Sequence, residues 1–390
     1  MTEPRQCILT VNAGSSSLRL ALFPLHDSAD ALLRIRVEAL GTADGPRCRM
    51  EPEQTASLTD SLLDGVRDHE QALGVLLDWV EARGDLRVAA VGHRLVHGGE
   101  RVAPVLIDET VVAELEGLVP LAPLHQGLAL KGMRTLVARR PDLPQVACFD
   151  TAFHSTLPDT ARLLPLAGGG ADLGARRYGF HGLSFEHAAR VMGERAPGAR
   201  RVVMAHLGAG ASVCALRDGR SRETSMGMTP LDGLPMATRC GSLDPGVLLW
   251  LLNVHGHDGA SLEELLYRHS GLMGISGISG DMRTLLESDQ RAARQAVDYF
   301  VYQCARQILA MTVALGGLDA IVFTGAIGEN SALIRARVLA LCPWPGLMLD
   351  ARANDAGADV ISSPESAVSL HRIVTDEEAV IAGHARAALR

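Results

Sequence analysis

The stretch at residues 202–245 reads VVMAHLGAGASVCALRDGRSRETSMGMTPLDGLPMATRCGSLDP and says more about the fold than any other part of the chain. Its apolar run, glycine turn and second β-prone run, from Ser212 to Leu216, predict a β-hairpin. A long polar loop that carries Arg239 and Asp244 follows. Because a glycine turn between two strands exposes backbone N–H groups, this turn is a candidate phosphate site.

The N-terminal residues 6–25, QCILTVNAGSSSLRLALFPL, repeat this pattern of apolar strand, small polar turn and apolar strand. LTVNAGSSSLRLAL beside MAHLGAGASVCAL indicates an internal duplication on the scale of a domain. Small-residue hairpins are common, so each hairpin alone is more often structural than phosphate-binding. The pair favours two similar halves that face each other across a cleft.

Length and composition limit the classes of protein to consider. A chain of 390 residues exceeds one ordinary core, so we expect two domains. Apolar residues at 47% and charged residues at 21% indicate a well-buried globular protein, and the net charge of −8 argues against a general nucleic-acid binder. Seven cysteines without a C-x-x-C pair favour neither a disulfide framework nor a zinc site. With no secretory signal and no apolar run long enough for a bilayer, we expect a soluble cytoplasmic protein without a membrane partner.

Polar side chains follow two segments that we expect to be buried strands. In residues 88–100, VAAVGHRLVHGGE, the expected strand carries His93, Arg94 and His97 at its end. The strand expected within 145–158 ends in Asp150. Open α/β sheets present their ligand-binding groups at strand ends. The structural alternatives stay open at this point, because Arg94 could form a surface salt bridge and Asp150 could cap a helix.

Two histidines lie at expected helix starts. His125 precedes a helix that should end near Arg140, and His181 follows an aromatic turn before a helix that begins near Ser184. An isolated histidine of this kind is more often structural than catalytic. The two positions are therefore candidates whose role depends on what surrounds them.

The rest of the chain should alternate helices with glycine-rich connections. Residues 318–330 predict a buried strand that enters a glycine turn before a helix near Ser331, which suits a nucleotide at a helix N-terminus. The last strand, at 367–376, delivers Glu377 and Glu378 to the C-terminal helix, where acids also suit the helix dipole. Further helices are expected at 57–83, 108–118, 246–254, 262–269 and 290–315, with loops at 163–174, a candidate hinge, and at 274–283.

Several common catalytic sites are excluded by inspection. The only lysine is Lys131, so no G-x-x-x-x-G-K-[ST] loop exists, and G-x-G-x-x-G, H-E-x-x-H and G-x-S-x-G are also absent. Glycine turns, strand-end arginines and histidines, and acids able to hold a hard cation remain. Phosphoryl transfer needs these groups, because its loose transition state depends on charge stabilisation by donors and Mg²⁺. Arg94 and Arg239 could clamp a small carboxylate acceptor by bidentate hydrogen bonds.

Seven motifs, in this order, make the chain resemble the acetate kinase family of the actin, sugar kinase and Hsp70 superfamily. They are NAGSSS at 12–17, HRLVHGG at 93–99, PLAPLH at 120–125, FDTAFH at 149–154, RRYGFHG at 176–182, TSMGMTPLDGL at 224–234 and TGAIGEN at 324–330. The resemblance implies an α/β fold made of a duplicated ribonuclease-H-like core, the actin-like ATPase fold, with two domains around a central cleft. The expected domains are 1–150 with 376–390, and 151–375, which would carry most of the nucleotide site.

The resemblance also implies which residues serve the transfer. Asn12 and Glu377 would hold Mg²⁺, with Mn²⁺ as an alternative metal. Arg94 and Arg239 would bind the acyl carboxylate and stabilise the transferring phosphoryl group. Asp150 would orient the substrate or Arg239.

Further roles implied by the resemblance fall into three groups. Two catalytic histidines, His181 and His125, would assist the transferring group. A small apolar pocket for the acyl chain would be formed by Val96, Leu124, Phe180 and Pro230. The residues that would contact ATP or ADP are Arg19, His206, Leu207, Gly208, Ala209, Gly210, Gly325, Ala326, Ile327, Gly328 and Glu329.

The implied activity is a reversible, in-line transfer of the γ-phosphoryl group of ATP to acetate, giving acetyl phosphate and ADP. Enzymes of this family are usually homodimers. Two alternatives stay open, namely propionate or butyrate as the main substrate, and a nucleotide switch like actin or Hsp70. The chain departs from the usual family residues at several points, among them Arg19 for lysine, Ala209 for asparagine, Ala326 for glycine, and T-D-E-E at 375–378 for T-N-E-E.

Overall fold

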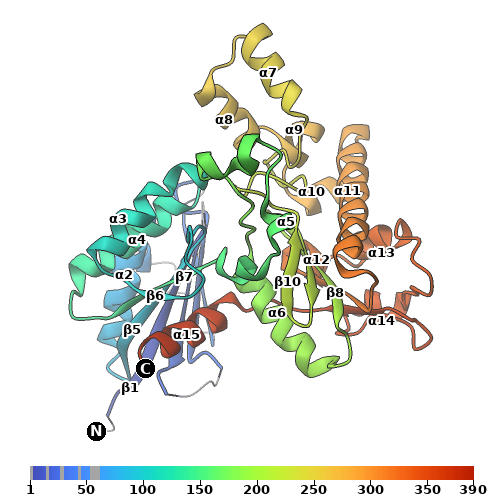
Figure 1. Cartoon of the computed structure of the whole chain (residues 1–390). Coiled ribbons are helices and arrows are strands. Elements are labelled where there is room, and N and C mark those ends of the chain that lie inside the picture. Colours follow the sequence, from blue (N-terminus) through green and yellow to red (C-terminus); the bar gives the residue numbers. More distant parts are fainter. Residues whose placement is uncertain (1–2, 15–16, 27–29, 43–44, 53–61) are drawn as a thin grey trace. The chain divides into compact units, whose positions relative to one another are not determined.

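The structure is a computed structural model of the whole chain and describes residues 3–14, 17–26, 30–42, 45–52 and 62–390. The central serines of the expected N-terminal turn and the first residues of the helix expected at 57–83 lie outside these ranges. The chain divides into two compact units. Unit 1 comprises Met1–Ala152 and Asp376–Arg390, and unit 2 comprises Phe153–Thr375. Figure 1 shows the elements of both units.

Unit 1 is built on a mixed sheet in the order β4-β3-β2-β1-β5-β7-β6. The expected N-terminal hairpin is confirmed, because β1 and β2 pair antiparallel with Asn12 opposite Arg19. Strands β1, β5 and β7 run parallel, which brings their carboxyl ends to one edge. The strands are β1 (Arg5–Ala13), β2 (Leu18–Pro24), β3 (Leu33–Glu38), β4 (Arg47–Glu51), β5 (Leu86–Leu95), β6 (Val105–Leu106) and β7 (Gln145–Phe149).

Helices cover both faces of the unit 1 sheet. Within the described residues the helix expected at 57–83 is not continuous, because 63–68 are not helical and α2 begins at His69, where Asp68 accepts a hydrogen bond from Gln71 N and caps it. The helices expected at 108–118 and after His125 are confirmed. The elements are α2 (His69–Ala82), α3 (Glu109–Gly117), η1 (Val119–Leu121), α4 (Gln126–Arg139) and α15 (Glu377–Ala388).

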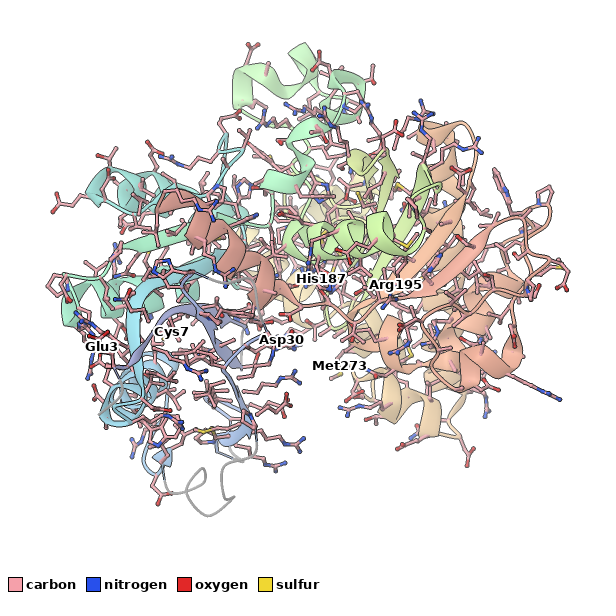
Figure 2. The ribbon with its side chains drawn as sticks, turned by 90° about the horizontal axis from the view of Figure 1, so that it is seen from below. Glu3, Cys7, Asp30, His187, Arg195 and Met273 are labelled. Carbon is pink, nitrogen blue, oxygen red and sulfur yellow. The ribbon has the colours of Figure 1, made fainter. Side chains whose placement is uncertain are left out.

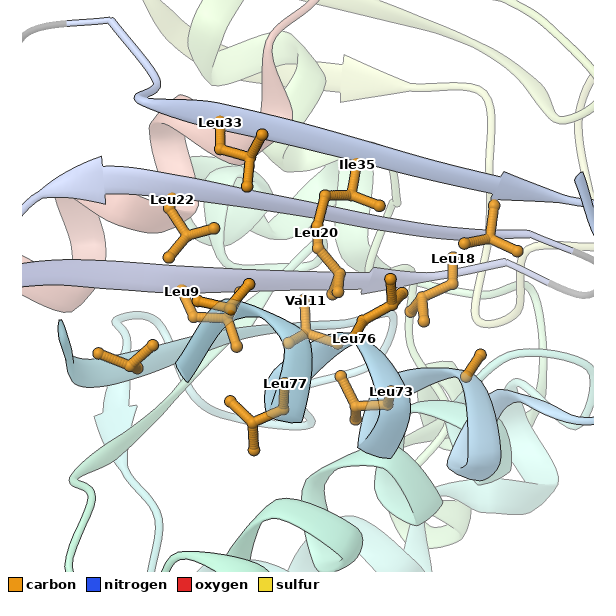
Figure 3. Packing of buried hydrophobic residues seen from close by; sticks show 14 of the residues in the cluster. Leu9, Val11, Leu18, Leu20, Leu22, Leu33, Ile35, Leu73, Leu76 and Leu77 are labelled. Carbon is orange, nitrogen blue, oxygen red and sulfur yellow. The ribbon is translucent and has the colours of Figure 1, made fainter. Parts of the chain in front are cut away.

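The core of unit 1 lies between the sheet and α2. Alternating residues of β1, β2 and β3 place their apolar side chains on one face, as strand periodicity requires. In Figure 3 these side chains meet three leucines of α2 that recur at helical spacing, Leu73, Leu76 and Leu77. The opposite face of β1, β2, β5 and β7 is in contact with α15. The C-terminal helix therefore brings Glu377 and Glu378 to the sheet that carries Asn12 and Arg94.

Unit 2 is built on a second sheet in the order β10-β9-β8-β11-β12. The hairpin expected from residues 202–245 is confirmed, because β8 and β9 pair antiparallel. The polar loop was expected to follow directly, but a third antiparallel strand intervenes. Asp218 and Gly219, both with positive φ, form the tight turn that this strand needs. The strands are β8 (Arg201–Leu207), β9 (Ala211–Arg217), β10 (Arg220–Thr224), β11 (Ala320–Thr324) and β12 (Ser369–Arg372).

The helices of unit 2 follow the expected pattern with four corrections, one of which is that α8 begins at Gly259, three residues before the expected start at 262. The longest, α11, agrees with the helix expected at 290–315, whereas α6 begins at Gly182, two residues before the expected Ser184; Figure 2 labels His187 and Arg195 on α6. The elements are η2 (Ala152–Thr156), which begins at the last residue of unit 1, α5 (Asp159–Arg162), η3 (Ala167–Leu173), α6 (Gly182–Arg195), α7 (Pro245–Val254), α8 (Gly259–Arg268), α9 (Gly271–Ser276), α10 (Met282–Glu287), α11 (Arg291–Leu315), α12 (Gly325–Asn330), α13 (Ala332–Ala340) and α14 (Ala351–Asp355).

The other two corrections concern glycine-rich segments. The loop expected at 274–283 is wrong at its ends, because α9 runs to Ser276 and α10 starts at Met282. The glycine turn expected within 318–330 is the short helix α12, whose first N–H is satisfied by Glu329. Glycine marks helix ends as well as loops, which is why the pattern misled us. The candidate hinge at 163–174 lies inside unit 2, and its motion stays a prediction.

Among the helices that the structure describes, none combines the length and the apolar character that a membrane span requires.

Candidate active site

Arg94 is the centre of a charged cluster in unit 1. It lies near the end of β5, and Asp150 directly follows β7, whose parallel register pairs Leu95 with Phe149. Arg94 Nε lies 3.1 Å and Nη2 2.7 Å from Oδ2 of Asp150, a residue with no exposed surface. The pair is therefore a buried ion pair and not a surface salt bridge. A guanidinium has five N–H donors, so these contacts leave capacity for a ligand.

Asn12 and the start of α15 complete this cluster. Arg94 Nη1 donates to Asn12 Oδ1 at 3.0 Å and lies 3.4 Å from Glu377 Oε2. Asn12 Nδ2 donates to Glu377 Oε2 at 2.9 Å and to Glu378 Oε1 at 3.3 Å. Asn12, Glu377 and Glu378 are all more than nine-tenths buried. The structure thus brings together Asn12, Arg94, Asp150 and Glu377, and it adds Glu378, which we expected only as a helix-start acid.

Burial and neighbouring charges act against each other in this cluster. Burial by itself would lower the pKa of Arg94, but Asp150, Glu377 and Glu378 more than offset it, so the pKa lies above its ordinary value. Burial raises the pKa of Glu378, and the charge of Glu377 raises it further, whereas Arg19 lowers it. Three carboxylates thus face the charges of Arg94 and Arg19. A bound cation would favour the charged form of Glu378, which burial and Glu377 disfavour.

The chemistry of the cluster suits a hard divalent cation. Carboxylate and amide oxygens from Asn12, Glu377 and Glu378 are ligands that Mg²⁺ prefers, usually together with water or phosphate. In this conformation Asn12 turns its oxygen to Arg94 and its nitrogen to Glu377, although amide orientation is assigned from such contacts. Within the described ranges, no three His, Cys, Asp or Glu side chains form a metal-binding group. The residues fit the cation by their chemistry, and waters or a phosphate would have to complete its ligand set.

The other predicted residues of unit 1 lie directly after β5 and directly before α4. Val96 is buried, Leu124 is half-buried, and His125 directly precedes α4, as expected. Gln126, the first residue of α4, was not singled out in the sequence analysis. Its side chain accepts from His97 N at 3.0 Å and donates to His97 O at 2.9 Å. Gln126 therefore ties the start of α4 to the segment after β5 and positions both Val96 and His125.

A histidine holds the β1–β2 turn from outside. His69, the first residue of α2, directs Nε2 to the carbonyl oxygens of Gly14 at 2.8 Å and Ser17 at 3.2 Å. Both partners are acceptors, so Nε2 must carry the proton. The turn also closes through donation from Gly14 N to Ser17 O at 2.8 Å. Arg19 follows this turn with an exposed side chain. Nothing in the local sequence pattern indicated that His69 reaches this turn.

In unit 2, His181 directly precedes α6 in a left-handed conformation, with φ of 60°. A non-glycine residue in this region is uncommon and marks a constrained position. His181 Nδ1 lies 2.8 Å from Ser212 Oγ, and the ring stacks on His206 with centroids 4.3 Å apart. His206 Nδ1 is hydrogen-bonded to Ser184 Oγ at 2.8 Å, and Ser184 to Thr375 Oγ1 at 3.0 Å. Both histidine rings are therefore fixed in orientation by hydroxyl groups.

Arg239 and His181 converge on the turn between β8 and β9. A Cβ added to Gly210 would lie 2.6 Å from Arg239 Nη2 and 3.0 Å from His181 Nε2, so only glycine leaves room here. Arg239 is 8% exposed and donates from Nη1 to Pro230 O at 2.6 Å. A buried guanidinium and an imidazole nitrogen beside one glycine form an arrangement that can stabilise an anionic transition state.

The two predicted nucleotide segments lie side by side in unit 2. Gly325 follows β11 with φ of +76°, and a Cβ there would meet the backbone of Leu207 at 2.8 Å. In the neighbouring turn, Gly208 N donates to Gly210 O at 2.9 Å, and Ala209 O accepts from the backbone of the following loop. The N–H group of Gly208 is therefore already used within the turn and is not available to a phosphate in this conformation.

Glu329 and Arg335 support the β11–α12 segment. Glu329 Oε1 accepts from Gly325 N at 2.9 Å and from Thr375 N at 3.0 Å, which shows a structural link to the segment before α15. Arg335, with 1% of its surface exposed, donates from Nη1 to the carbonyls of Gly328 and Glu329 at 2.9 and 3.0 Å. Sequence reasoning missed Arg335, because an arginine inside a helix pattern normally indicates a solvent-exposed face.

The apolar residues predicted in unit 2 are Phe180 and Pro230, and both are buried. Phe180 O lies 3.0 Å from Nε2 of His154, whose Nδ1 lies 2.9 Å from Ser221 Oγ. Burial lowers the pKa of His154 to about 4. This ring is therefore neutral at pH 7 and acts as a structural link that holds Phe180 in place.

Each unit gathers one part of the predicted site. Unit 1 contains Asn12, Arg19, Arg94, Val96, Leu124, His125, Asp150 and Glu377. Unit 2 contains Phe180, His181, His206, Leu207, Gly208, Ala209, Gly210, Pro230, Arg239, Gly325, Ala326, Ile327, Gly328 and Glu329.

Comparison with known proteins identifies the family. The model of the acetokinase family matches residues 7–383. This chain belongs to the acetokinase family. Acetate kinase of Rhodopseudomonas palustris is 46% identical over 385 residues, which are 97% of this chain and 97% of that protein. Acetate kinase of Rhizobium meliloti is 45% identical over 382 residues, with the same coverage of 97% of each chain.

Solved structures extend the comparison to the fold. The crystal structure of Porphyromonas gingivalis acetate kinase has a TM-score of 0.84 at 33% identity and covers 99% of this chain and 100% of that chain. A Francisella tularensis propionate kinase has a TM-score of 0.88 at 31% identity, with 98% and 99% covered. These similarities and the two sheets confirm the expected α/β fold of the actin-like ATPase type with two domains. As an acetokinase, the chain is a phosphotransferase, an ATP-dependent acyl kinase.

Proposed function

We propose that this acetokinase transfers the γ-phosphoryl group of ATP reversibly to acetate, giving acetyl phosphate and ADP by direct in-line displacement. The observation that carries the proposal is the convergence of Arg239 and His181 on Gly210. Two nitrogen-bearing side chains beside one glycine turn suit a planar phosphoryl group, whose charge is spread over three oxygens in the transition state. Arg239 supplies charge there, and His181 Nε2 supplies a hydrogen bond.

Ser212 determines what His181 can do. When the Ser212 hydroxyl donates to His181 Nδ1, the ring proton lies on Nε2, the nitrogen beside Gly210. A neutral histidine in this state is a hydrogen-bond donor to the transferring group and needs no change of protonation during the reaction. The stacked His206 keeps the ring in its plane.

The charged cluster of unit 1 serves the acceptor and the cation. We assign the acyl carboxylate to Arg94, whose guanidinium is held in orientation by the buried Asp150. Asn12, Glu377 and Glu378 would hold Mg²⁺, with Mn²⁺ as an alternative. When bound, the cation would neutralise charge on the nucleotide phosphates. Without the cation, Arg94 lies 3.4 Å from Glu377 and offsets part of the negative charge.

The nucleotide is assigned to the β8–β9 turn and to the β11–α12 segment. Phosphate oxygens would take the N–H groups of the turn around Ala209, and the adenosine would lie along Gly325–Glu329. Arg19, exposed on β2, is assigned to the phosphates because it replaces the lysine that is usual in the family. A change of Arg19 to glutamine should therefore raise the KM for ATP more than the KM for acetate.

Acyl chain length is assigned to the apolar residues Val96, Leu124, Phe180 and Pro230. Each methylene that such a pocket accepts or refuses changes the barrier by about 1–3 kcal/mol. The preference for acetate over propionate or butyrate should therefore be real but modest, and the named propionate kinase among the structural relatives makes propionate the first competitor to measure. Values of kcat/KM for the three acids decide between them, and a higher value for propionate or butyrate would reassign the substrate.

The main experiment traps acyl phosphate with hydroxylamine. Purified protein, ATP, Mg²⁺ and acetate should give acetyl hydroxamate, and leaving out either ATP or acetate should abolish it. The competing function is a nucleotide switch, which would bind ATP without making acyl phosphate. Tight ATP binding without hydroxamate from any short acid would favour the switch and reject the acyl kinase.

We also propose that the protein forms a homodimer. Helix α7 is the support for this proposal, because none of its residues is buried and Leu249, Trp250 and Val254 are exposed by 59%, 52% and 67%. Figure 1 shows α7 and α8 standing away from the sheet of unit 2. An uncharged helix with exposed leucines and a tryptophan is typical of a surface that another protein covers. A monomeric mass by light scattering at micromolar concentration would reject the homodimer.

A further inference from the structure

Three acids stand in a row at the start of α15, and each is held differently. Glu377 and Glu378 are buried and face Asn12 and Arg94. Asp376 instead caps the helix, because its Oδ1 accepts from Ala379 N at 3.0 Å. Because Asp376 directly precedes Glu377, the position of this cap affects the orientation of Glu377 in the first turn of α15.

Asp376 is itself held from the sheet. Arg34 on β3 donates from Nη2 to Asp376 Oδ2 at 2.5 Å and from Nη1 to Oδ1 at 3.1 Å. The two hydrogen bonds are bidentate, so they fix the orientation of the guanidinium relative to the carboxylate in addition to pairing their charges. The guanidinium also lies over the ring of Phe23, 5.5 Å from its centroid, and Phe23 is buried on β2. Arg34 is thus fixed on one side by the sheet and on the other by α15.

Charge in this region explains why the contact matters. Asp376, Glu377 and Glu378 are consecutive at the start of α15, and the guanidinium of Arg34 is the cation that pairs with Asp376. Without a cation on Asp376, three adjacent carboxylates would repel one another at the helix start. Turning one of them outward would also move Glu377 away from Asn12.

We propose that Arg34 is a positioning residue for Glu377. Through its two-pronged ion pair with Asp376, it fixes the first turn of α15 on the sheet and neutralises the outermost of three consecutive acids. Glu377 and Glu378 then remain the carboxylates that face Asn12 and Arg94. The inference rests on the proposed function, in which Glu377 holds the cation.

The size of the effect separates positioning from simple stabilisation. The side chains of Arg34 and Asp376 are 24% and 26% exposed, and ion pairs with this much solvent access add little to folding stability. Loss of a residue that orients a ligand of a metal typically lowers activity or metal affinity by about 10- to 100-fold. A purely structural Arg34 would therefore change kcat very little.

The test is a double-mutant cycle with a matched control. Arg34→Met removes the fork but keeps the aliphatic stem, Asp376→Asn keeps the cap but removes the charge, and the third variant carries both changes. Arg83→Met is the control, because Arg83 also makes a two-pronged pair with an aspartate in unit 1, also lies over an aromatic ring, and is also 24% exposed.

We expect Arg34→Met to lower kcat roughly tenfold, at the low end for a ligand-orienting residue, with little change in the KM for acetate. Asp376→Asn keeps the cap but breaks the two-pronged pair, so it should also lower kcat, by a smaller factor because it removes one of the three charges as well. In the Asp376→Asn background, Arg34→Met should then cost much less than in the unchanged protein, since no third charge remains to be neutralised. An equal loss in both backgrounds would overturn the proposal, as would a loss of the same size in Arg83→Met.

A second readout needs neither substrate nor metal. Hydrogen exchange at the Ala379 amide, which donates to Asp376, should speed up in Arg34→Met and stay unchanged in Arg83→Met when the protein is free of nucleotide and cation. Unchanged exchange in Arg34→Met would overturn the positioning role. Should the unmodified protein make no acyl phosphate at all, the proposed function fails, while the exchange measurement still decides whether Arg34 orders the start of α15.

Discussion

The two hairpins of this protein share a strand pattern but differ in the contacts that hold their turns. Both turns are closed by their own backbone, from Gly14 N to Ser17 O in unit 1 and from Gly208 N to Gly210 O in unit 2. The β1–β2 turn is also held by a side chain from another element, because His69 donates to the carbonyls of Gly14 and Ser17. A duplicated strand pattern thus preserves the position of a turn, while separate tertiary contacts determine its shape.

The side chains gathered at the two hairpins differ as well. Asn12 at the end of β1 lies in a cluster with three carboxylates and Arg94, which suits a cation. Gly210 after β8 lies beside Arg239 and His181, which suits an anion. The same backbone pattern therefore carries side chains of mainly negative charge in unit 1 and of positive charge in unit 2.

The largest effect is expected from removing the guanidinium group of Arg239 beside the β8–β9 turn. Arg239→Ala should lower kcat by roughly 10³-fold, the low end for arginines that stabilise a transferring phosphoryl group. Steady-state kinetics with ATP and acetate measure this, with the exposed Arg200→Ala of the same unit as control. A kcat within a few-fold of the unchanged protein would remove Arg239 from the transfer step.

Acid should destabilise both units through one buried histidine in each. Burial lowers the pKa of His93 in unit 1 and of His154 in unit 2 to about 4. Because the unfolded chain binds a proton near pH 6.5 and the folded one does not, stability is complete above pH 6.5 and falls as pH drops towards 4. Each histidine can contribute up to about 3 kcal/mol to this loss.

Unfolding midpoints between pH 7 and pH 4.5 measure the effect for each histidine. His93 lacks a hydrogen bond to Nδ1 among the described residues, whereas both nitrogens of His154 are hydrogen-bonded. Replacing either histidine by asparagine should flatten the pH dependence. An unchanged slope in both variants would show that other groups cause the acid sensitivity.

Filling the β8–β9 turn should damage the site without removing any functional group. In Gly210→Ala, the new methyl group would overlap Arg239 Nη2 and His181 Nε2, so both must move. Misplacement of this kind typically costs about 10²-fold in rate. Gly193→Ala in α6 is the control, since a Cβ there meets nothing within 4 Å. If Gly210→Ala keeps its full kcat, the convergence on Gly210 has no catalytic meaning.

The smallest effect is expected at the β1–β2 turn. His69→Ala leaves two carbonyl oxygens without their donor and should destabilise unit 1 by about 1–3 kcal/mol. His69→Gln keeps an N–H donor on a side chain of similar reach and should recover part of this loss. Thermal unfolding of the two variants gives the comparison, and equal stability would show that the turn does not depend on His69.

The sequence predicted most of the secondary structure, and it named Asn12, Arg94, Asp150 and Glu377, which the structure brings into contact and whose roles stay predictions. Strand alternation gave both hairpins, and helical periodicity gave α3, α4 and α11, because these signals depend only on neighbouring residues. The Asp218–Gly219 turn was present in the sequence as a hairpin signal but was overlooked. Glycine-rich segments were the weakest part, since glycine ends helices such as α9 as readily as it forms loops.

Residues that act over long sequence distances could not be found in this way. Gln126 binds the backbone of His97 from a separate helix, and Arg335 supports Glu329 from α13. Neither contact leaves a mark on local periodicity. Both become visible only when the two segments pack against each other, because a hydrogen bond depends on distance and direction in space and not on spacing in the chain.

The sequence by itself determined the strand and helix pattern, the two-hairpin duplication and, through its motifs, the family. Those properties follow from the chemistry and spacing of residues close together in the chain. The tertiary structure alone decided that Asn12 meets Glu377 from the far end of the chain, that Arg34 holds Asp376, and that Gly210 leaves room for Arg239. These pairs are set by how the sheets and helices pack, so they depend on the whole fold and cannot be read from any one segment.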